Sequence, residues 1–339
     1  MRFQALKYLL GVLLMWFVTT GAWAQTEVSC NFNEGAAASS TPSARSTVKR
    51  STSRAAQTAR RSTTRRTRAK APVLQSAYPA QVVAVRGDVQ LVSRVGQVLG
   101  MPRQLKPYDQ LSVNDEVQTL SRGFVSLRFA DGSQSVLPSN AHIQLLEASM
   151  GVPRVKLISG AIENRVTKKP NARKSTFEIQ LPVVTVGVRG THFKVTNDSS
   201  NQRVSVEGGV VKVQQRFACA APMTLNAGQG AIVSPVASKV MDLLDAPMLS
   251  NTEAAQRDAK RMVFDVKPVE GAASYRVQVA RDEAFLDVQQ EALSSDTRVV
   301  LDDDDLPEGF YYVRVSAVDA AGLDGRSKTH VFLRSHQSN

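Results

Sequence analysis

The residues of this chain that could do chemistry are few and scattered. Its four histidines lie far apart in the sequence. His192 sits on the polar side of an alternating run, which predicts exposure to solvent rather than metal ligation. The aspartates at positions 302–305 could offer oxygens to calcium, but they lack the spacing and turn glycine of a calcium loop, so a solvated turn is favoured. We expect no metal and no cofactor.

Catalytic motifs are missing as well. Gly228-Gln229-Gly230 has neither a third glycine nor a following helix, so it is not a dinucleotide site. The sequence contains no nucleophile elbow, zinc-protease motif or phosphate loop. A carboxylate pair for glycoside cleavage depends on three-dimensional spacing and stays open. These features favour a protein that is not an enzyme.

The N-terminus has the pattern of an export signal. A basic start with Arg2 and Lys7 precedes an apolar stretch at 8–18 and a small-x-small site at 22–24. This pattern predicts a signal peptide over residues 1–24, with an uncleaved anchor as the alternative. No other apolar run reaches the roughly 18 residues that a membrane span needs. The sequence therefore predicts a periplasmic or secreted protein.

Ten of the twelve net positive charges come from one segment, because residues 41–70 hold ten Lys or Arg residues and no acid, and Arg2 and Lys7 of the predicted signal peptide supply the other two. The surrounding stretch 25–77 is rich in Arg, Ser and Thr, which predicts disorder. It is either a solvated linker or an arm that contacts an anionic polymer or lipid surface. Without interleaved aromatic residues, specific nucleic-acid recognition is not expected. The candidate contact residues are Arg60, Arg61, Arg65, Arg66 and Arg68.

Two cysteines remain after export. In an oxidising compartment Cys30 and Cys219 could pair, which would tie the basic segment to the folded part of the chain. The alternative is two free or intermolecular thiols, and the sequence leaves this choice open.

Residues 78–236 alternate apolar and polar positions and predict an all-β body. We expect one hairpin with its turn at Gly87-Asp88 and another with its turn at Asp131-Gly132. Within residues 183–213 the apolar positions change from even to odd numbers after Gly190. A strand has period two, so a bulge or bend is predicted there.

Residues 246–335 contain further short alternating strands, spaced as in a β-sandwich. Residues 237–245 between the two bodies predict a linker. The whole chain is therefore expected to be all-β, with a disordered basic segment near its N-terminus.

The first body contains a set of short motifs with glycine at recurring places. Their residues are Gly87, Asp88, Asp131, Gly132, Gly160, Gly190, Thr191, Phe193, Glu207 and Gly208. In this order the motifs resemble those of the FecR-type periplasmic domain family. The resemblance implies a layered or coil-like stack of short strands, in which the motif residues shape the fold rather than form a site.

The chain departs from the family's transmembrane sigma regulators, which resemble one another in a cytoplasmic helical segment before one membrane span. Here a predicted signal peptide stands in that place, which argues against direct contact with a sigma factor. No LysM repeat is found. Residues 246–335 resemble a bacterial fibronectin type III-like module through 268–275 and 306–315, with Phe264 where such modules often have Trp.

Two functional hypotheses follow. The first is a non-catalytic exported cell-envelope protein, a binding or scaffolding module that recognises a protein or glycan partner and uses its basic arm on anionic surfaces. The second is a sensory or regulatory subunit that acts through a membrane partner.

Overall fold

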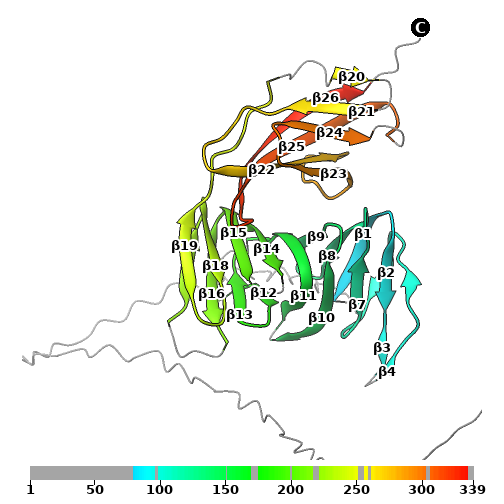
Figure 1. Ribbon diagram of the computed structural model, residues 1–339. Coiled ribbons are helices and arrows are strands. Elements are labelled where there is room, and N and C mark those ends of the chain that lie inside the picture. The colour runs from blue at the N-terminus through cyan, green and yellow to red at the C-terminus, as the bar shows by residue number, and fades with distance from the viewer. Residues whose placement is uncertain are drawn as a thin grey trace, which may run out of the picture. The chain divides into compact units, whose positions relative to one another are not determined.

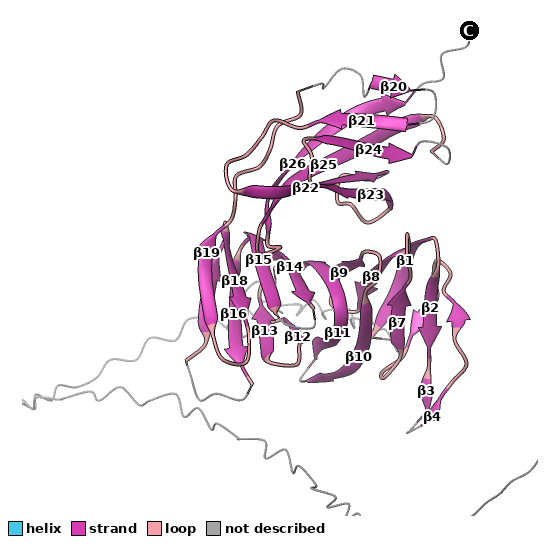
Figure 2. Cartoon of the chain, in the orientation of Figure 1, coloured by secondary structure: helices cyan, strands magenta, loops and turns pink. Residues whose placement is uncertain are grey.

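The computed structural model describes residues 79–95, 98–149, 151–168, 175–198, 201–216, 221–250, 256–258, 261–302 and 306–334. All the regular elements among them are β-strands, which confirms the all-β prediction (Figure 2). The described ranges include no helix of the length and hydropathy that a membrane crossing requires. The predicted signal peptide, the Arg-rich segment, Cys30 and Cys219 lie outside them.

Strands β1 to β19 form a two-sheet body, in which most strands belong to one of two sheets that we call sheet A and sheet B (Figure 1). Sheet A contains β1 (Ala80–Arg86), β6 (Gln110–Leu111), β8 (Phe124–Phe129), β9 (Gln134–Leu137), β14 (His192–Asn197), β15 (Gln202–Gly208), β18 (Gln229–Val233) and β19 (Ser238–Asp242). Sheet B contains β2 (Val89–Val92), β5 (Arg103–Gln104), β7 (Glu116–Thr119), β10 (His142–Ser149), β12 (Phe177–Gln180), β13 (Val184–Val188), β16 (Val210–Gln215) and β17 (Met223–Asn226). A separate pair consists of β3 (Arg94–Val95) and β4 (Val98–Leu99).

The long strand β11 (Val152–Arg165) belongs to both sheets. Its first half pairs with β10 and β12 in sheet B, and its second half pairs with β9 and β14 in sheet A. Gly160 stands at the change of sheet, with φ +79°. One strand therefore carries the chain from one layer to the other.

The two sheets share one apolar core. Every second side chain of a strand faces the core, as the pleat of a strand requires, so Val184, Val186 and Val188 of β13 are buried together. Phe129 of sheet A packs edge-on against Phe177 of sheet B, with ring centroids 4.9 Å apart. The core thus lies between the layers and leaves both outer faces to polar side chains.

Passages between the sheets occur at residues with positive φ. An ordinary side chain makes this left-handed conformation unfavourable, and glycine does not. The φ angle at Gly190 is +61°, between β13 in sheet B and β14 in sheet A, and the buried positions change there from even to odd numbers. The predicted register slip is confirmed. The other such corners are Gly87, Tyr108, Asn114, Arg122, Asn140, Gly160, Gly209 and Gly228.

Two local expectations turn out differently. The predicted hairpin at Gly87-Asp88 is wrong, because β1 pairs in sheet A and β2 in sheet B, so Gly87 forms a corner instead. The segment 237–245, expected as a linker, contains β19, which pairs with β18. The hairpin at Asp131-Gly132 is confirmed, since β8 and β9 pair and Gly132 has φ +85°.

The C-terminal sandwich consists of two sheets around a second core. The three-stranded sheet contains β20 (Gln256–Asp258), β21 (Arg261–Asp265) and β24 (Arg298–Asp302). The four-stranded sheet has the order β23 (Val288–Ser294), β22 (Ala272–Ala280), β25 (Gly309–Asp319) and β26 (Asp324–Arg334). Phe264 is buried in this core and packs edge-on against Phe332, with ring centroids 6.1 Å apart.

Replacing Gly160 by alanine should destabilise the chain strongly. A Cβ atom there would lie 2.3 Å from the backbone oxygen of Asn140 and 2.6 Å from the Cα atom of Ala141, and neither backbone atom can move freely. Gly151→Ala is the matched control, because Gly151 also has positive φ (+75°) but nothing within 4 Å of the added atom.

We expect the control to lose about 1 kcal/mol from backbone strain alone and Gly160→Ala to lose at least twice as much. Urea denaturation of the two variants measures this difference. Equal losses would show that crowding at the corner does not matter.

Candidate functional site

The outer face of sheet A carries charged side chains near its centre. His192 and Lys194 alternate on β14 with Phe193 and Val195, which are buried in the core. Glu163 is the register partner of Lys194 on the neighbouring strand β11. The same alternation that fills the core therefore lines up polar groups on the opposite face.

The four-stranded sheet of the sandwich presents a matching polar face. On β25, Val313 and Val315 face the sandwich core, and Arg314 points the other way. Although it faces away from its own core, Arg314 is only 7% exposed. The covering side chains come from sheet A, and all described residues fall within one compact unit of the chain.

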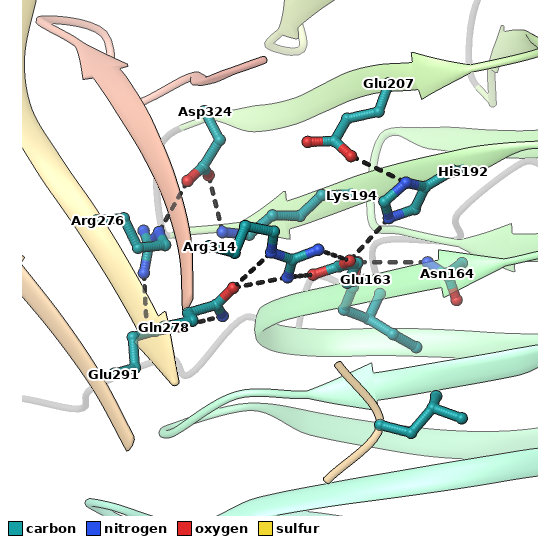
Figure 3. Close-up of polar contacts among 12 residues, drawn as sticks. Glu163, Asn164, His192, Lys194, Glu207, Arg276, Gln278, Glu291, Arg314 and Asp324 are labelled. Atoms are coloured by element: carbon teal, nitrogen blue, oxygen red, sulfur yellow. Dashed lines mark hydrogen bonds and ion pairs between the residues drawn. The ribbon is translucent and has the colours of Figure 1, made fainter. Parts of the chain in front are cut away.

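We call this contact the ionic interface (Figure 3). The two-sheet body contributes acids and bases from β11, β14 and β15, and the sandwich contributes them from β22, β23, β25 and β26. Its members are Glu163, His192, Lys194, Glu207, Arg276, Gln278, Glu291, Arg314 and Asp324.

The central contact is a two-pronged ion pair. The Nη1 and Nη2 atoms of Arg314 donate to the two carboxylate oxygens of Glu163 at 2.6 and 2.5 Å. The Nε atom of Arg314 donates to Gln278 Oε1 at 2.9 Å, and its guanidinium carbon lies 4.4 Å from the centre of the Phe285 ring. A planar guanidinium is suited to this combination of a carboxylate fork and a ring face.

A second set of pairs surrounds Asp324. Its two carboxylate oxygens accept from Arg276 Nε and from Lys194 Nζ, both at 2.8 Å. Arg276 also binds Glu291 at 2.7 Å, and Gln278 Nε2 donates to the same carboxylate at 2.5 Å. Gln278 therefore links the two sets.

His192 lies between two carboxylates, so the predicted exposure to solvent is wrong. Its Nε2 atom is 2.7 Å from Glu163 and its Nδ1 atom is 2.8 Å from Glu207. Burial alone would lower the pKa of His192, but the hydrogen bonds to the two carboxylates raise it above its ordinary value. The two carboxylates therefore favour the protonated ring.

The pKa values of the neighbouring carboxyl groups shift in the opposite direction. Burial would raise the pKa of Glu163, yet the charges of Arg314 and His192 hold it well below the ordinary range. The pKa of Glu207 is lowered by His192 against the same effect of burial. With His192 protonated, four cations face four anions in the interface, so the buried charge is balanced.

The ionic interface is suited to holding the two-sheet body and the sandwich together rather than to catalysis. The cavity inside the ionic interface has a volume of about 30 Å³, too small for a substrate. Both ring nitrogens of His192 are engaged by carboxylates, so neither is available to activate a nucleophile. No group of three His, Cys, Asp or Glu residues in the described ranges is arranged to hold a metal.

Apolar contacts add to the ionic ones. Phe124 and Val136 of the two-sheet body form one cluster with Ala280, Phe285 and Val288 of the sandwich. Burial of such side chains supplies the favourable energy that ion pairs alone do not, because desolvation offsets most of their attraction.

The structure places most of the motif residues at separate positions and does not bring them together in one site. Gly87, Gly160 and Gly190 are corners, and Phe193 is a core residue. Other positions have local roles: Asp131 Oδ1 accepts from the Ser133 backbone at 3.0 Å, Asp88 lies directly after the Gly87 corner, and Thr191 is buried. Gly208 ends β15, and the positive φ falls on Gly209 instead.

Of the motif residues, only Glu207 enters the ionic interface. Sequence reasoning missed Glu163 and Arg314. The one sign of these two residues in the sequence is a charged side chain at a polar position of an alternating strand. A strand face exposed to solvent gives the same pattern, so the two cases cannot be told apart from the sequence. Asp302 ends β24, and the rest of the aspartate run lies outside the described residues.

The raised pKa of His192 predicts a pH dependence of stability. Its contribution to the free energy of unfolding is fully present below its ordinary pKa of about 6.5 and is lost as the pH rises through the higher folded-state value. The stability difference between the native chain and His192→Gln should therefore shrink as the pH rises above about 6.5, as urea denaturation would measure.

His330→Gln is the control with the opposite sign, because burial and Lys328 lower the pKa of that ring. Its difference from the native chain should not shrink in the same direction. A His192→Gln difference that stays constant with pH would contradict the assignment.

The pair Arg314–Glu163 should be strongly coupled. Arg314→Met or Glu163→Leu alone leaves a buried charge without its partner and should destabilise by roughly 3–5 kcal/mol. The double variant should lose less than the sum of the single losses, by about 1–3 kcal/mol.

A double-mutant cycle on Arg103 and Asp109 serves as the control, since that pair lies 2.7 Å apart with Arg103 half exposed. Its coupling should stay below about 1 kcal/mol. Similar coupling in both cycles would mean that burial at the ionic interface has no energetic effect.

Solved structures offer only distant likenesses. Two crystal structures of a candidate anti-sigma factor from Parabacteroides distasonis ATCC 8503 share 19% and 16% identity with this chain, with TM-scores of 0.32 and 0.33. The matches cover 37% and 41% of this chain, and they span 57% and 68% of those chains. With TM-scores this low they carry no conclusion about function.

A third likeness is to the extracellular domain of the candidate one-component system BT4673 from B. thetaiotaomicron, with 11% identity and a TM-score of 0.17. That match covers 63% of this chain and 35% of the other. No curated protein sequence matches the chain.

The family comparison is more specific. The family model described as FecR protein matches residues 115–212, which run from the start of β7 into β16. The matched range includes Glu163, His192 and Glu207, and thus the half of the ionic interface that sheet A provides. The chain is therefore similar to this family over residues 115–212.

Proposed function

We propose that this chain is a non-catalytic regulatory or sensory protein that works in the periplasm or outside the cell through contact with a membrane protein. Of the two hypotheses from the sequence, the FecR domain at residues 115–212 favours the second. The ionic interface supports the proposal that the FecR domain and the sandwich act together as one recognition unit. Each contributes buried charges that would lack a partner without the other.

The observation that carries the proposal is an exposed apolar patch on the four-stranded sheet. Phe310, Val331 and Leu333 are 69%, 57% and 52% exposed. Phe310 is the register partner of Leu333, and Val331 stands opposite Tyr312 one step along the same face. Apolar side chains gathered on an open sheet face are typical of protein-binding surfaces.

The C-terminal sandwich is proposed to be the fibronectin type III-like module that the sequence resembles. The Tyr311 hydroxyl donates to the backbone oxygen of Pro307 at 2.7 Å, four residues upstream. This is the arrangement of a tyrosine corner, which recurs in immunoglobulin-like sandwiches. Such a module would supply the partner-binding face.

The basic segment is proposed to act as an arm that concentrates the protein on anionic glycans or lipid headgroups. Its ten cations at 41–70 and the absence of acids there support this role. A paired Cys30 and Cys219 would keep the arm close to the FecR domain. The arm would add local concentration, and the patch would add specificity.

Photo-crosslinking in intact cells tests the proposal. A photoreactive residue at Phe310 should capture one defined membrane protein, and Val331→Asp should abolish that product because a charge in the patch opposes burial. The control position is Val240, an exposed residue of β19 in sheet A.

A scaffolding protein would instead give a mixed set of products or glycan adducts. The same products from positions 310 and 240, or none from 310, would overturn the proposal. Removal of residues 41–70 should reduce the yield without changing the identity of the captured protein, and the reduction should itself lessen at higher salt.

A further inference from the structure

A cleft with a volume of about 550 Å³ lies beside the ionic interface. One wall comes from the two-sheet body, at the Gly87 corner and the neighbouring Arg122 corner, and the other from the edge of the sandwich. This volume is within the range of ligand sites. It is much larger than the cavity of about 30 Å³ inside the ionic interface.

The lining of the cleft includes apolar side chains and an arginine whose guanidinium has no carboxylate partner among the described residues. Val85 is partly exposed, and Val300 is 44% exposed. Arg86 donates from Nε to the backbone oxygen of Gln289 at 3.0 Å, and the contacts of the described residues include no ion pair of its guanidinium. Glu291, the acid in the lining, is already bound by Arg276 and Gln278. The unbalanced charge in the cleft is therefore positive.

A strand edge runs along the cleft. The lining includes the consecutive β23 residues Gln289, Gln290, Glu291 and Ala292. Within the described strands β23 pairs only with β22, so its other edge has no ladder partner. An unpaired edge beside a cavity is the arrangement in which an extended peptide adds as a further strand.

We propose that this cleft binds an extended peptide segment that carries a carboxylate side chain. The peptide backbone pairs with β23, the carboxylate binds the Arg86 guanidinium, and flanking apolar side chains pack against Val85 and Val300. Four lining residues of a strand span about 13 Å, so the bound segment is about four residues long. The biological meaning of this site rests on the proposed function, since a sensory protein needs a ligand or partner segment to read.

Nuclear magnetic resonance titration of the full chain with synthetic peptides tests the site. The probe is an acetylated and amidated Thr-Val-Glu-Val-Thr peptide, compared with Thr-Val-Gln-Val-Thr and with an N-methylated form of the first. The acidic peptide should shift the amide signals of Gln289 to Ala292 and should bind at least tenfold more tightly than the other two. N-methylation removes strand pairing without any change to the protein.

Arg86→Gln should abolish the preference for the acidic peptide. Arg128→Gln is the matched control, because Arg128 is exposed on β8 and does not line the cleft. A thermal melt of each variant checks folding, and Arg86→Lys should keep part of the preference through its charge.

Equal binding of the acidic and neutral peptides, equal binding of the N-methylated peptide, shifts confined to other strands, or no shift at about 1 mM peptide would overturn the inference. The outcome is separate from the crosslinking test. Peptide binding in the cleft without a captured membrane protein would keep this site and reject the proposed function.

Discussion

The two-sheet body depends on one constraint, the corner residues with left-handed backbone conformation at which the chain changes sheet. Alternation decides which side chains face the core within one sheet, but a strand that simply continues stays in its layer. At Gly160 and Gly190 the chain passes between sheets A and B, and each passage decides which parity faces the core afterwards. The corners also pack on one another, because a Cβ atom on Gly160 would meet the Asn140 corner and one on Gly209 would meet Gly190.

The ionic interface depends on these corners. Glu163 follows the Gly160 corner by three residues, and His192 follows Gly190 by two, so the position of each corner places the side chain on the outer face. A slip by one residue would turn Glu163 into the core, where no partner could balance its charge. The corners therefore set both the packing of the core and the register at which Arg314 finds a carboxylate. Ion pairs add little net stability when buried, but a wrong pairing is strongly unfavourable, so they select one arrangement of the two bodies.

The local sequence predicted the features of the fold that depend on interactions between residues close together in the chain. Alternation and the Asp131-Gly132 turn predicted β8 and β9, and the change of phase located the Gly190 corner. The Gly87-Asp88 turn was misread, because a glycine turn between two strands looks the same whether the chain stays in its sheet or leaves it. His192 was correctly placed on the polar side of its strand, but its burial comes from Arg314 and its neighbours more than a hundred residues away in the sequence. No local pattern records which polar face a second body will cover.

The cleft and the ionic interface are connected through Glu291. Glu291 lines the cleft, and its carboxylate binds Gln278, whose amide oxygen binds Arg314, which in turn holds Glu163 of the two-sheet body. A ligand in the proposed site that favoured one position of Glu291 would therefore act on the contact between the sandwich and the two-sheet body through this short chain of hydrogen bonds. By thermodynamic linkage the reverse also holds, since any change in the state of His192 that alters this contact changes ligand affinity by the same factor. Because Glu163 and Glu207 raise the pKa of His192, the protonated ring strengthens this contact and its deprotonation weakens it.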